Sequence, residues 1–140
     1  MTTKPTKPGK LTRLHENDKN YPKVPSGDIL EVFENKYPQR DYLITFDCPE
    51  FTSVCPVTGQ PDFGKIVIEY CPDTYCIESK SLKLYLGAYR NEGSFAEQIV
   101  NRVLEDCVNA CQPRSMIVTG HFTARGGIAI KVEAGYTADA

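Results

Sequence analysis

The stretch Phe63-Gly64-Lys65-Ile66-Val67-Ile68-Glu69-Tyr70 alternates between two kinds of side chain and decides the fold class. One face carries Ile66, Ile68 and Tyr70, and the other carries Lys65, Val67 and Glu69. Alternation at a period of two residues predicts a β-strand with one face buried and the other exposed. The rest of the chain therefore has to supply further strands and a layer that covers the apolar face.

Short apolar segments on both sides of this stretch predict the other strands. Two precede it, at 28–33 and 41–46, and two follow it, at 115–123 and 128–132. In the segment 115–123, Met116, Val118 and Phe122 share one face. The pair Gly126-Gly127 marks a turn between the last two strands.

Two segments between these strands show the periodicity of amphipathic helices. In 79–89 the apolar residues recur at i, i+3, i+4 and i+7, and Lys80, Lys83 and Arg90 form the opposite stripe. A second helix is expected over 95–111, with Phe95 among its inward residues. The order β-β-β-α-α-β-β predicts an α+β fold, in which an antiparallel sheet carries both helices on one face.

Size and composition narrow the function classes. The 140 residues predict one domain over 21–140, after a disordered tail over 1–20. A net charge of −2 gives no basis for non-specific nucleic-acid binding. No apolar run approaches the ~20 residues of a membrane span, and the N-terminus lacks the apolar core of a secretory signal. We therefore expect a cytoplasmic protein without a nucleic-acid or membrane partner.

Six cysteines occur, at positions 48, 55, 71, 76, 107 and 111. An even number fits a disulfide framework, but such frameworks are typical of short secreted chains. There is no C-x-x-C, and neither His15 nor His121 lies at ligand spacing from a cysteine pair, so no metal site is predicted. Cys107 and Cys111 lie one helical turn apart on an apolar face, which indicates buried packing residues.

The run Cys55-Pro56-Val57-Thr58-Gly59-Gln60-Pro61-Asp62 joins a thiol to a carboxylate through a stiff turn. The prolines fix their own φ, and Gly59 can supply a position with positive φ. Cys55 is the candidate nucleophile, and Asp62 can take its proton and later return it as a general acid. A proline-rich turn with a surface cysteine and a turn-capping aspartate explains the same run equally well.

Two other stretches combine basic side chains with backbone that could hold a phosphate. Ser79 or Ser81 can cap the helix that begins there, so that free N–H groups lie beside Lys80 and Lys83. The run Arg125-Gly126-Gly127 offers a guanidinium and close backbone approach. A solvated basic helix face and a plain hairpin turn are the alternative explanations.

The tetrapeptide Ser94-Phe95-Ala96-Glu97 begins the second helix and has two interpretations. As a capping box, Glu97 reaches back to the N–H of Ser94. Alternatively, Glu97 points into a pocket and accepts hydrogen bonds from an amidine-like base edge.

Four stretches together, 51–62, 78–85, 95–97 and 122–128, resemble the NADPH-dependent 7-cyano-7-deazaguanine reductases, the nitrile reductases of queuosine biosynthesis. The resemblance covers about residues 28–130 and is to the short, single-domain branch. It implies a tunnelling fold, in which subunits join antiparallel sheets into barrels and bind purine- or pterin-like substrates at subunit interfaces. It therefore implies a homo-oligomer.

The resemblance also implies the chemistry. Cys55 attacks the nitrile carbon to give a covalent thioimide, while Asp62 helps activate the thiol and donates a proton. Two hydrides from NADPH give the aminomethyl product, and the thiolate leaves between them. The implied substrate contacts are Ile77, Glu78, Ser79, Ala96 and Glu97, and the implied dinucleotide contacts are Ser79, Lys80, Lys83, Arg125 and Gly126.

One position departs from the family pattern, which has histidine directly before the glutamate where this chain has Ala96. Losing one positioned acid–base group costs roughly 10²–10⁴ in rate. This leaves three alternatives to the reductase: a non-reducing binder that captures the nitrile through Cys55, an amidine-forming relative that acts on tRNA, and a disulfide-stapled binding module.

Overall fold

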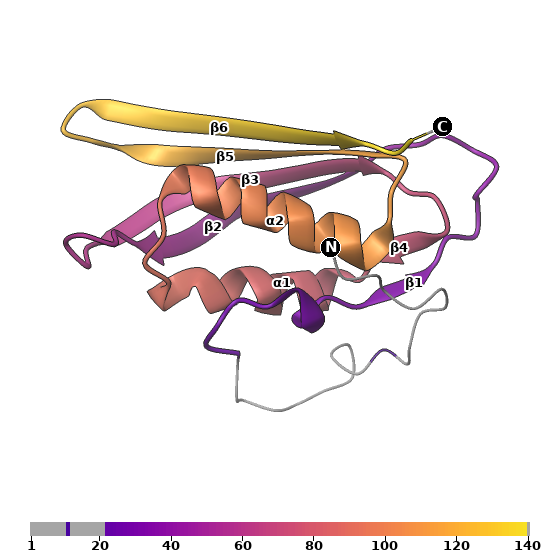
Figure 1. Cartoon of the computed structure of the whole chain (residues 1–140), viewed down its shortest axis with the longest axis horizontal. Coiled ribbons are helices and arrows are strands. Elements are labelled where there is room, and N and C mark those ends of the chain that lie inside the picture. Colours follow the sequence, from indigo (N-terminus) through magenta and orange to yellow (C-terminus); the bar gives the residue numbers. More distant parts are fainter. Residues whose placement is uncertain (1–10, 12–21, 140) are drawn as a thin grey trace.

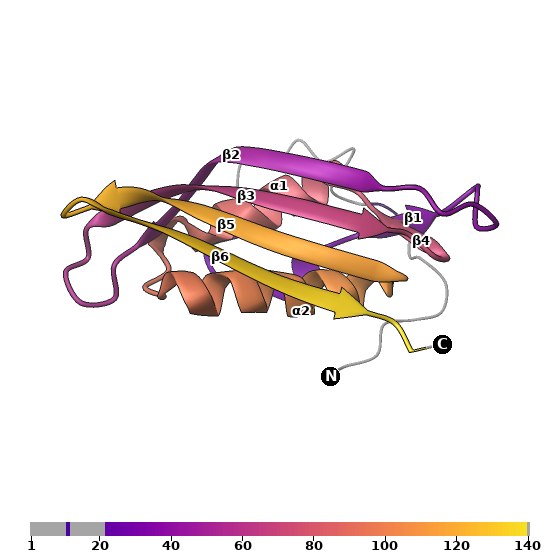
Figure 2. The same ribbon diagram turned by 90° about the horizontal axis from the view of Figure 1, so that it is seen from above.

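The core of the molecule lies between a four-stranded antiparallel sheet and two helices on one of its faces (Figure 1). The computed structural model describes residue 11 and residues 22–139. The strand order is β2-β3-β5-β6, which can be followed from above in Figure 2. The strands are β2 Ile44–Val54, β3 Pro61–Cys71, β5 Ser115–Arg125 and β6 Ile128–Thr137, and the helices are α1 Ser79–Gly87 and α2 Ala96–Cys111. The predicted α+β class is confirmed.

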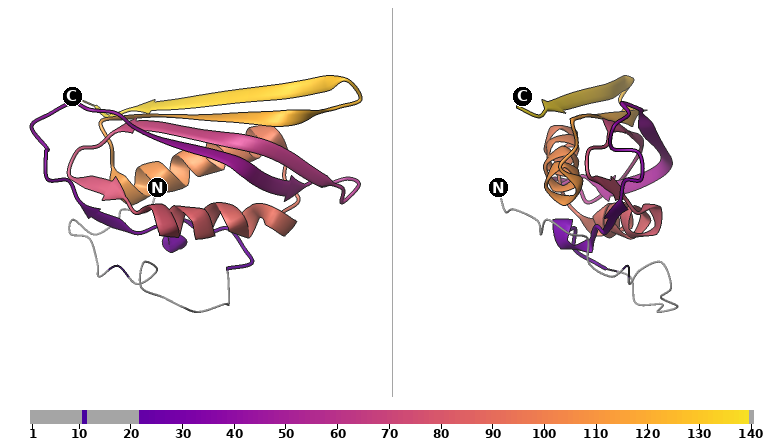
Figure 3. Two further views of the ribbon diagram at one scale, coloured as in Figure 1. Left: turned by 180° about the vertical axis from the view of Figure 1, so that it is seen from behind. Right: turned by 90° about the vertical axis from the view of Figure 1, so that its right-hand side faces the viewer.

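Buried and exposed side chains alternate along β3 as predicted. Ile66, Ile68 and Tyr70 are fully buried against the helices, whereas Lys65 and Glu69 are exposed. On the neighbouring strand β5, Met116, Val118 and Phe122 are buried as well. The end-on view in Figure 3 shows the sheet curving over both helices, so its inner face forms one wall of the core.

The helices follow the predicted periodicity, with one error. The apolar stripe of α1 and of the short 3-10 helix η2, Ala88–Asn91, is buried, as are Cys107 and Cys111 on α2. Phe95 was expected to point inward but is 54% exposed, because it is the extended residue that precedes α2. Gln112 ends α2 in the left-handed conformation, with φ 48°, directly before Pro113.

The expected strands at 28–33 and 41–46 are wrong in part. Residues Gly27–Ile29 form the 3-10 helix η1, capped by the Ser26 hydroxyl, and only Val32–Glu34 is a strand, β1. Strand β1 pairs with β4, Tyr75–Ile77, which the sequence did not reveal. Strand β2 continues far past residue 46, because a register shift between Cys48 and Phe51 accommodates Pro49 on an edge strand.

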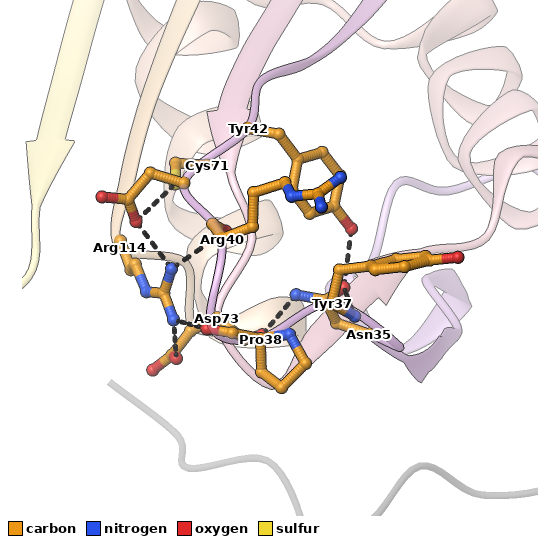
Figure 4. Close-up of polar contacts among 9 residues, drawn as sticks. Asn35, Tyr37, Pro38, Arg40, Tyr42, Cys71, Asp73 and Arg114 are labelled. Carbon is orange, nitrogen blue, oxygen red and sulfur yellow. Dashed lines mark hydrogen bonds and ion pairs between the residues drawn. The ribbon is translucent and has the colours of Figure 1, made fainter.

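Arg114, the residue directly before β5, connects the loops at the end of the sheet beside β1 and β4 (Figure 4). The Arg114 guanidinium contacts Asp41 at 2.7 Å and Asp73 at 3.2 Å, and it donates to the carbonyls of Pro38 and Arg40. These contacts hold the loop before β2 against the loop between β3 and β4.

The expected tail over 1–20 lies outside the described residues, apart from residue 11. None of the helices in the described part of the chain has the length and hydrophobicity of a membrane-spanning segment. No group of three His, Cys, Asp or Glu side chains suited to a metal ion occurs among these residues either.

Candidate active site

Cys55 begins the tight turn that joins β2 to β3. Its N–H donates to the carbonyl of Gln60 at 2.8 Å, and its carbonyl accepts from the N–H of Gly59 at 2.9 Å. Gly59 has φ 72°, the left-handed conformation that glycine adopts without strain. The predicted stiff turn is confirmed, and it presents a partly exposed thiol.

The surroundings of Cys55 favour its thiolate. The pKa of Cys55 is lowered by a hydrogen bond from the Thr58 side chain and by the backbone N–H groups of Thr58 and Val57, while the charge of Asp62 opposes this effect. Burial instead raises the pKa of four other cysteines, Cys48, Cys76, Cys107 and Cys111. All six cysteines are free, so the disulfide-stapled module is wrong.

Asp62 lies on β3, close enough for its charge to act on Cys55. Its Oδ1 is 2.7 Å from Nε of Arg125. Arg125, which was expected to bind the dinucleotide, therefore contacts Asp62, the predicted proton donor. Ser53 on β2 is directly opposite Asp62, and its buried hydroxyl has no hydrogen-bond partner among the described residues. Neither neighbour of Asp62 was predicted from the sequence.

The segment before α2 packs beside this turn. The N–H of Val54 donates to the carbonyl of Glu92 at 3.1 Å, and Gly93 forms a parallel bridge with Val54. Ala96 and Glu97 follow in the first turn of α2, so they belong to the same end of the molecule as Cys55. The predicted capping box is wrong, because Gln98 rather than Glu97 accepts the hydrogen bond, from the N–H of Phe95 at 3.1 Å.

The start of α1 is capped by Glu78 and not by Ser79 or Ser81. The Glu78 carboxylate is buried and accepts from the N–H groups of Lys80 at 2.7 Å and Ser81 at 2.8 Å. Two of the N–H groups expected to face a phosphate are therefore already used, next to a carboxylate. A phosphate at this helix would bind mainly through side chains.

Such side chains line a groove of about 920 Å³ between β2 and the helices α1 and η2. Ser79 and Lys83 lie in it, together with Lys23 and Arg90. Arg90 belongs to the basic stripe visible in the sequence, whereas nothing in the sequence singled out Lys23. The Asp47 carboxylate also lies there, 3.4 Å from Nζ of Lys65.

The expected site residues fall into two groups at opposite ends of α1 and η2 (Figure 1). From Glu78 to Asn91 the chain is helical, and at about 1.5 Å per residue it spans roughly 20 Å. One end holds Cys55, Asp62, Glu97 and Arg125, and the other holds Ile77, Glu78, Ser79 and Lys80. A single copy of the chain does not bring both groups together.

Comparison with known proteins identifies the family of this chain. The model of the QueF-like protein family matches residues 61–140. Over 120 residues the chain is 52% identical to the NADPH-dependent 7-cyano-7-deazaguanine reductase of Streptococcus mutans, covering 86% of this chain and 74% of that relative. The chain belongs to the QueF-like family.

Further QueF-like relatives agree. The reductase of the same name from Chlorobaculum tepidum is 56% identical over 110 residues, covering 79% of this chain and 94% of its own. The reductase of the same name from Bacteroides fragilis is 53% identical over 109 residues, covering 78% of this chain and 72% of that relative. The crystal structure of the apo form of an archaeosine synthase QueF-Like superposes with a TM-score of 0.64 at 22% identity, covering 70% of this chain and 96% of that one. This last likeness supports the QueF-like fold.

The lowered pKa of Cys55 gives a first prediction. Replacing Thr58→Val removes the strongest stabilising hydrogen bond and is expected to move the rise of iodoacetamide alkylation of Cys55 to higher pH. The sign follows because the thiolate forms as the pH passes the pKa, and the pKa increases in the variant. Peptide mass spectrometry across a pH series measures it, with Thr52→Val as the control, and a superimposable profile would contradict it.

Proposed function

We propose that the protein uses NADPH to reduce the nitrile of 7-cyano-7-deazaguanine to 7-aminomethyl-7-deazaguanine, a step of queuosine biosynthesis. The observation that carries this proposal is Cys55, a cysteine of lowered pKa on a stiff turn beside Asp62. Relatives named NADPH-dependent 7-cyano-7-deazaguanine reductase, which are 52–56% identical over most of the chain, support the proposal. A cofactor-dependent reduction and a free thiol both fit the reducing cytoplasm, where we expect the protein to act.

The first chemical step needs only the chain and the substrate. The Cys55 thiolate attacks the nitrile carbon, the third bond of C≡N opens, and the nitrile nitrogen takes a proton from Asp62. Thiol and nitrile thereby combine into a thioimide with no oxidant, reductant or leaving group. The adduct has a C=N bond that accepts hydride more readily than the free nitrile does, and it is fixed in position.

The residues at the two ends of α1 recognise the deazaguanine ring of the substrate. The carboxylate of Glu97, exposed on the first turn of α2, accepts hydrogen bonds from the N–H groups of the deazaguanine ring. Ala96 beside it lines the same pocket, together with Ile77, Glu78 and Ser79 of a second copy of the chain.

NADPH, when bound, supplies the hydride for both reductions. The donor set suits its phosphates, because the groove beside α1 gathers the hydroxyl of Ser79 with the cations of Lys83, Lys23 and Arg90. We propose Ser79, Lys80 and Lys83 as its contacts at this end, with Arg125 and Gly126 at the other.

Both sets of contacts require two copies of the chain. Cys55, Asp62 and Glu97 of one copy would meet Ile77, Glu78 and Ser79 of another, in a homo-oligomer with shared sites. β2 and β6 are the edge strands of the four-stranded sheet, and apart from the Val54–Gly93 bridge no described strand pairs with their outer edges, so sheets of neighbouring copies can join there.

A subunit-mixing experiment tests this arrangement. Cys55→Ala and Glu78→Gln proteins are each expected to be inactive, and refolding them together in equal amounts is expected to restore about a quarter of wild-type activity. The fraction follows because one site in four draws both intact residues from different copies. Mixing without recovery would show that each site lies within one copy.

The function itself is tested by incubating the protein with 7-cyano-7-deazaguanine and following both intact mass and NADPH absorbance. We expect an adduct of the full substrate mass on Cys55, which disappears with NADPH oxidation when the cofactor is added. Absence of both signals would refute the proposal. An adduct that persists with NADPH would instead identify a non-reducing binder, the second candidate, which Ala96 favours.

A further inference from the structure

Arg125, at the end of β5, directs its whole guanidinium at three consecutive residues of the Cys55 turn. Nε lies 2.7 Å from Oδ1 of Asp62, and Nη1 donates to Oε1 of Gln60 at 3.0 Å. The third nitrogen, Nη2, donates to the carbonyl of Pro61. A planar fork with fixed donor directions can satisfy three acceptors at once, which a lysine cannot do.

Through Gln60 the same guanidinium reaches the nucleophile. The carbonyl of Gln60 accepts the N–H of Cys55 at 2.8 Å, the bond that closes the turn. Arg125 therefore contacts Asp62 directly and supports Cys55 through one intermediate residue. The side chains of Asp62 and Arg125 are 25% and 43% exposed, so the pair is accessible to substrate and not part of the packed core.

The backbone of the β5–β6 hairpin is built to bring Arg125 there. The pairing of β3 with β5 ends at Phe122, and the pairing of β5 with β6 shifts register between Phe122 and Arg125. Gly126 and Gly127, with φ 58° and 82°, then reverse the chain. Arg125 reaches the turn through its side chain, beyond the end of the β3–β5 ladder, and contacts two side chains and one backbone carbonyl there.

We propose that Arg125 is a positioning residue for thiol addition, which holds Asp62 and the Cys55 turn in the reacting arrangement before NADPH takes part. This rests on the proposed function and adds to it, because the resemblance assigns Arg125 only to the dinucleotide. The two roles separate cleanly in experiment, since formation of the thioimide consumes no cofactor.

The test measures the rate of adduct formation with 7-cyano-7-deazaguanine in the absence of NADPH, by rapid quench and intact-mass spectrometry. In Arg125→Gln we expect addition to slow by roughly ten- to a hundredfold, the effect of a misplaced reacting pair. Arg125→Lys is expected to recover only part of the rate, because it restores the charge without the fork.

The matched control is Arg114→Gln, at the opposite end of β5. Its guanidinium also binds carboxylates and backbone carbonyls, at a loop far from Cys55. This variant is expected to lose as much thermal stability as Arg125→Gln but to keep the wild-type rate of addition. A purely structural role for Arg125 predicts instead that the two variants behave alike.

An unchanged addition rate in Arg125→Gln, with KM for NADPH raised, would overturn the proposal and leave Arg125 as a cofactor contact only. If the wild-type protein forms no adduct, the proposed function fails, and the pH profile of Cys55 alkylation then decides about Arg125. A profile that Arg125→Gln leaves unmoved would refute the positioning role.

Discussion

Replacing Cys55→Ala is expected to abolish the substrate adduct and to lower NADPH oxidation by at least about 10⁴-fold. The reason is that the variant loses the group that forms a covalent bond to the nitrile carbon, and neither Asp62 nor bound water is a comparable nucleophile. Binding of the deazaguanine ring does not need the thiol. Calorimetry of Cys55→Ala is therefore expected to show reversible, non-covalent binding of the substrate.

The control for this variant is Cys71→Ala. Cys71 lies at the end of β3 that is remote from the Cys55 turn. Cys71 is buried at the end of β3 and has no part in the proposed chemistry. This variant is expected to form the adduct at the wild-type rate. Detection of the substrate mass on any cysteine other than Cys55, or turnover by Cys55→Ala, would contradict the assignment.

Replacing Ala96→His is expected to increase the rate at which NADPH consumes the adduct by roughly 10²-fold. Ala96 is the first residue of α2 and immediately precedes Glu97. The resemblance to the nitrile reductases implies a histidine at this position. An imidazole can donate and accept protons near neutral pH, and one such positioned group contributes about 10²–10⁴. Single-turnover kinetics measure this, starting from the preformed adduct.

Ala96→Gln separates acid–base chemistry from simple hydrogen bonding. Glutamine has a similar length and can hydrogen-bond, but it does not titrate. We expect it to give little of the gain, and the gain in Ala96→His to vary with pH near 6.5, the ordinary pKa of histidine. Equal gains from both substitutions would show that position 96 contributes a hydrogen bond alone.

The parts of the fold that follow from local periodicity were predictable. The alternation of β3 and the apolar stripe of α1 appear in the structure as buried faces, since burial selects the same residues that the pattern marks. The turn at Gly59 was predictable for the same reason, because its conformation depends on neighbours in sequence. Where local signals competed, as at 28–33, the capped 3-10 helix replaced most of the expected strand.

Helix caps were harder, because several residues near each helix start have suitable side chains. Glu78 takes the cap of α1 instead of either serine, and it is buried there beside β4, a strand that pairs with a segment far away in sequence. Gln98 similarly takes the place predicted for Glu97 and leaves that carboxylate exposed. The residue that caps the helix is selected by the direction from which the chain enters it, and tertiary packing sets that direction.

The sequence by itself determined the sheet, the two helices that cover it, and the rigid turn that presents Cys55. These depend on spacings of a few residues, which the backbone geometry of strands, helices and turns translates directly into faces. Only the tertiary structure decided that Arg125 meets Asp62 across the sheet, and that the expected site residues lie at opposite ends of α1. Such contacts join residues more than 60 positions apart, as Arg125 and Gln60 are, and they follow from strand order and packing, which no local pattern encodes.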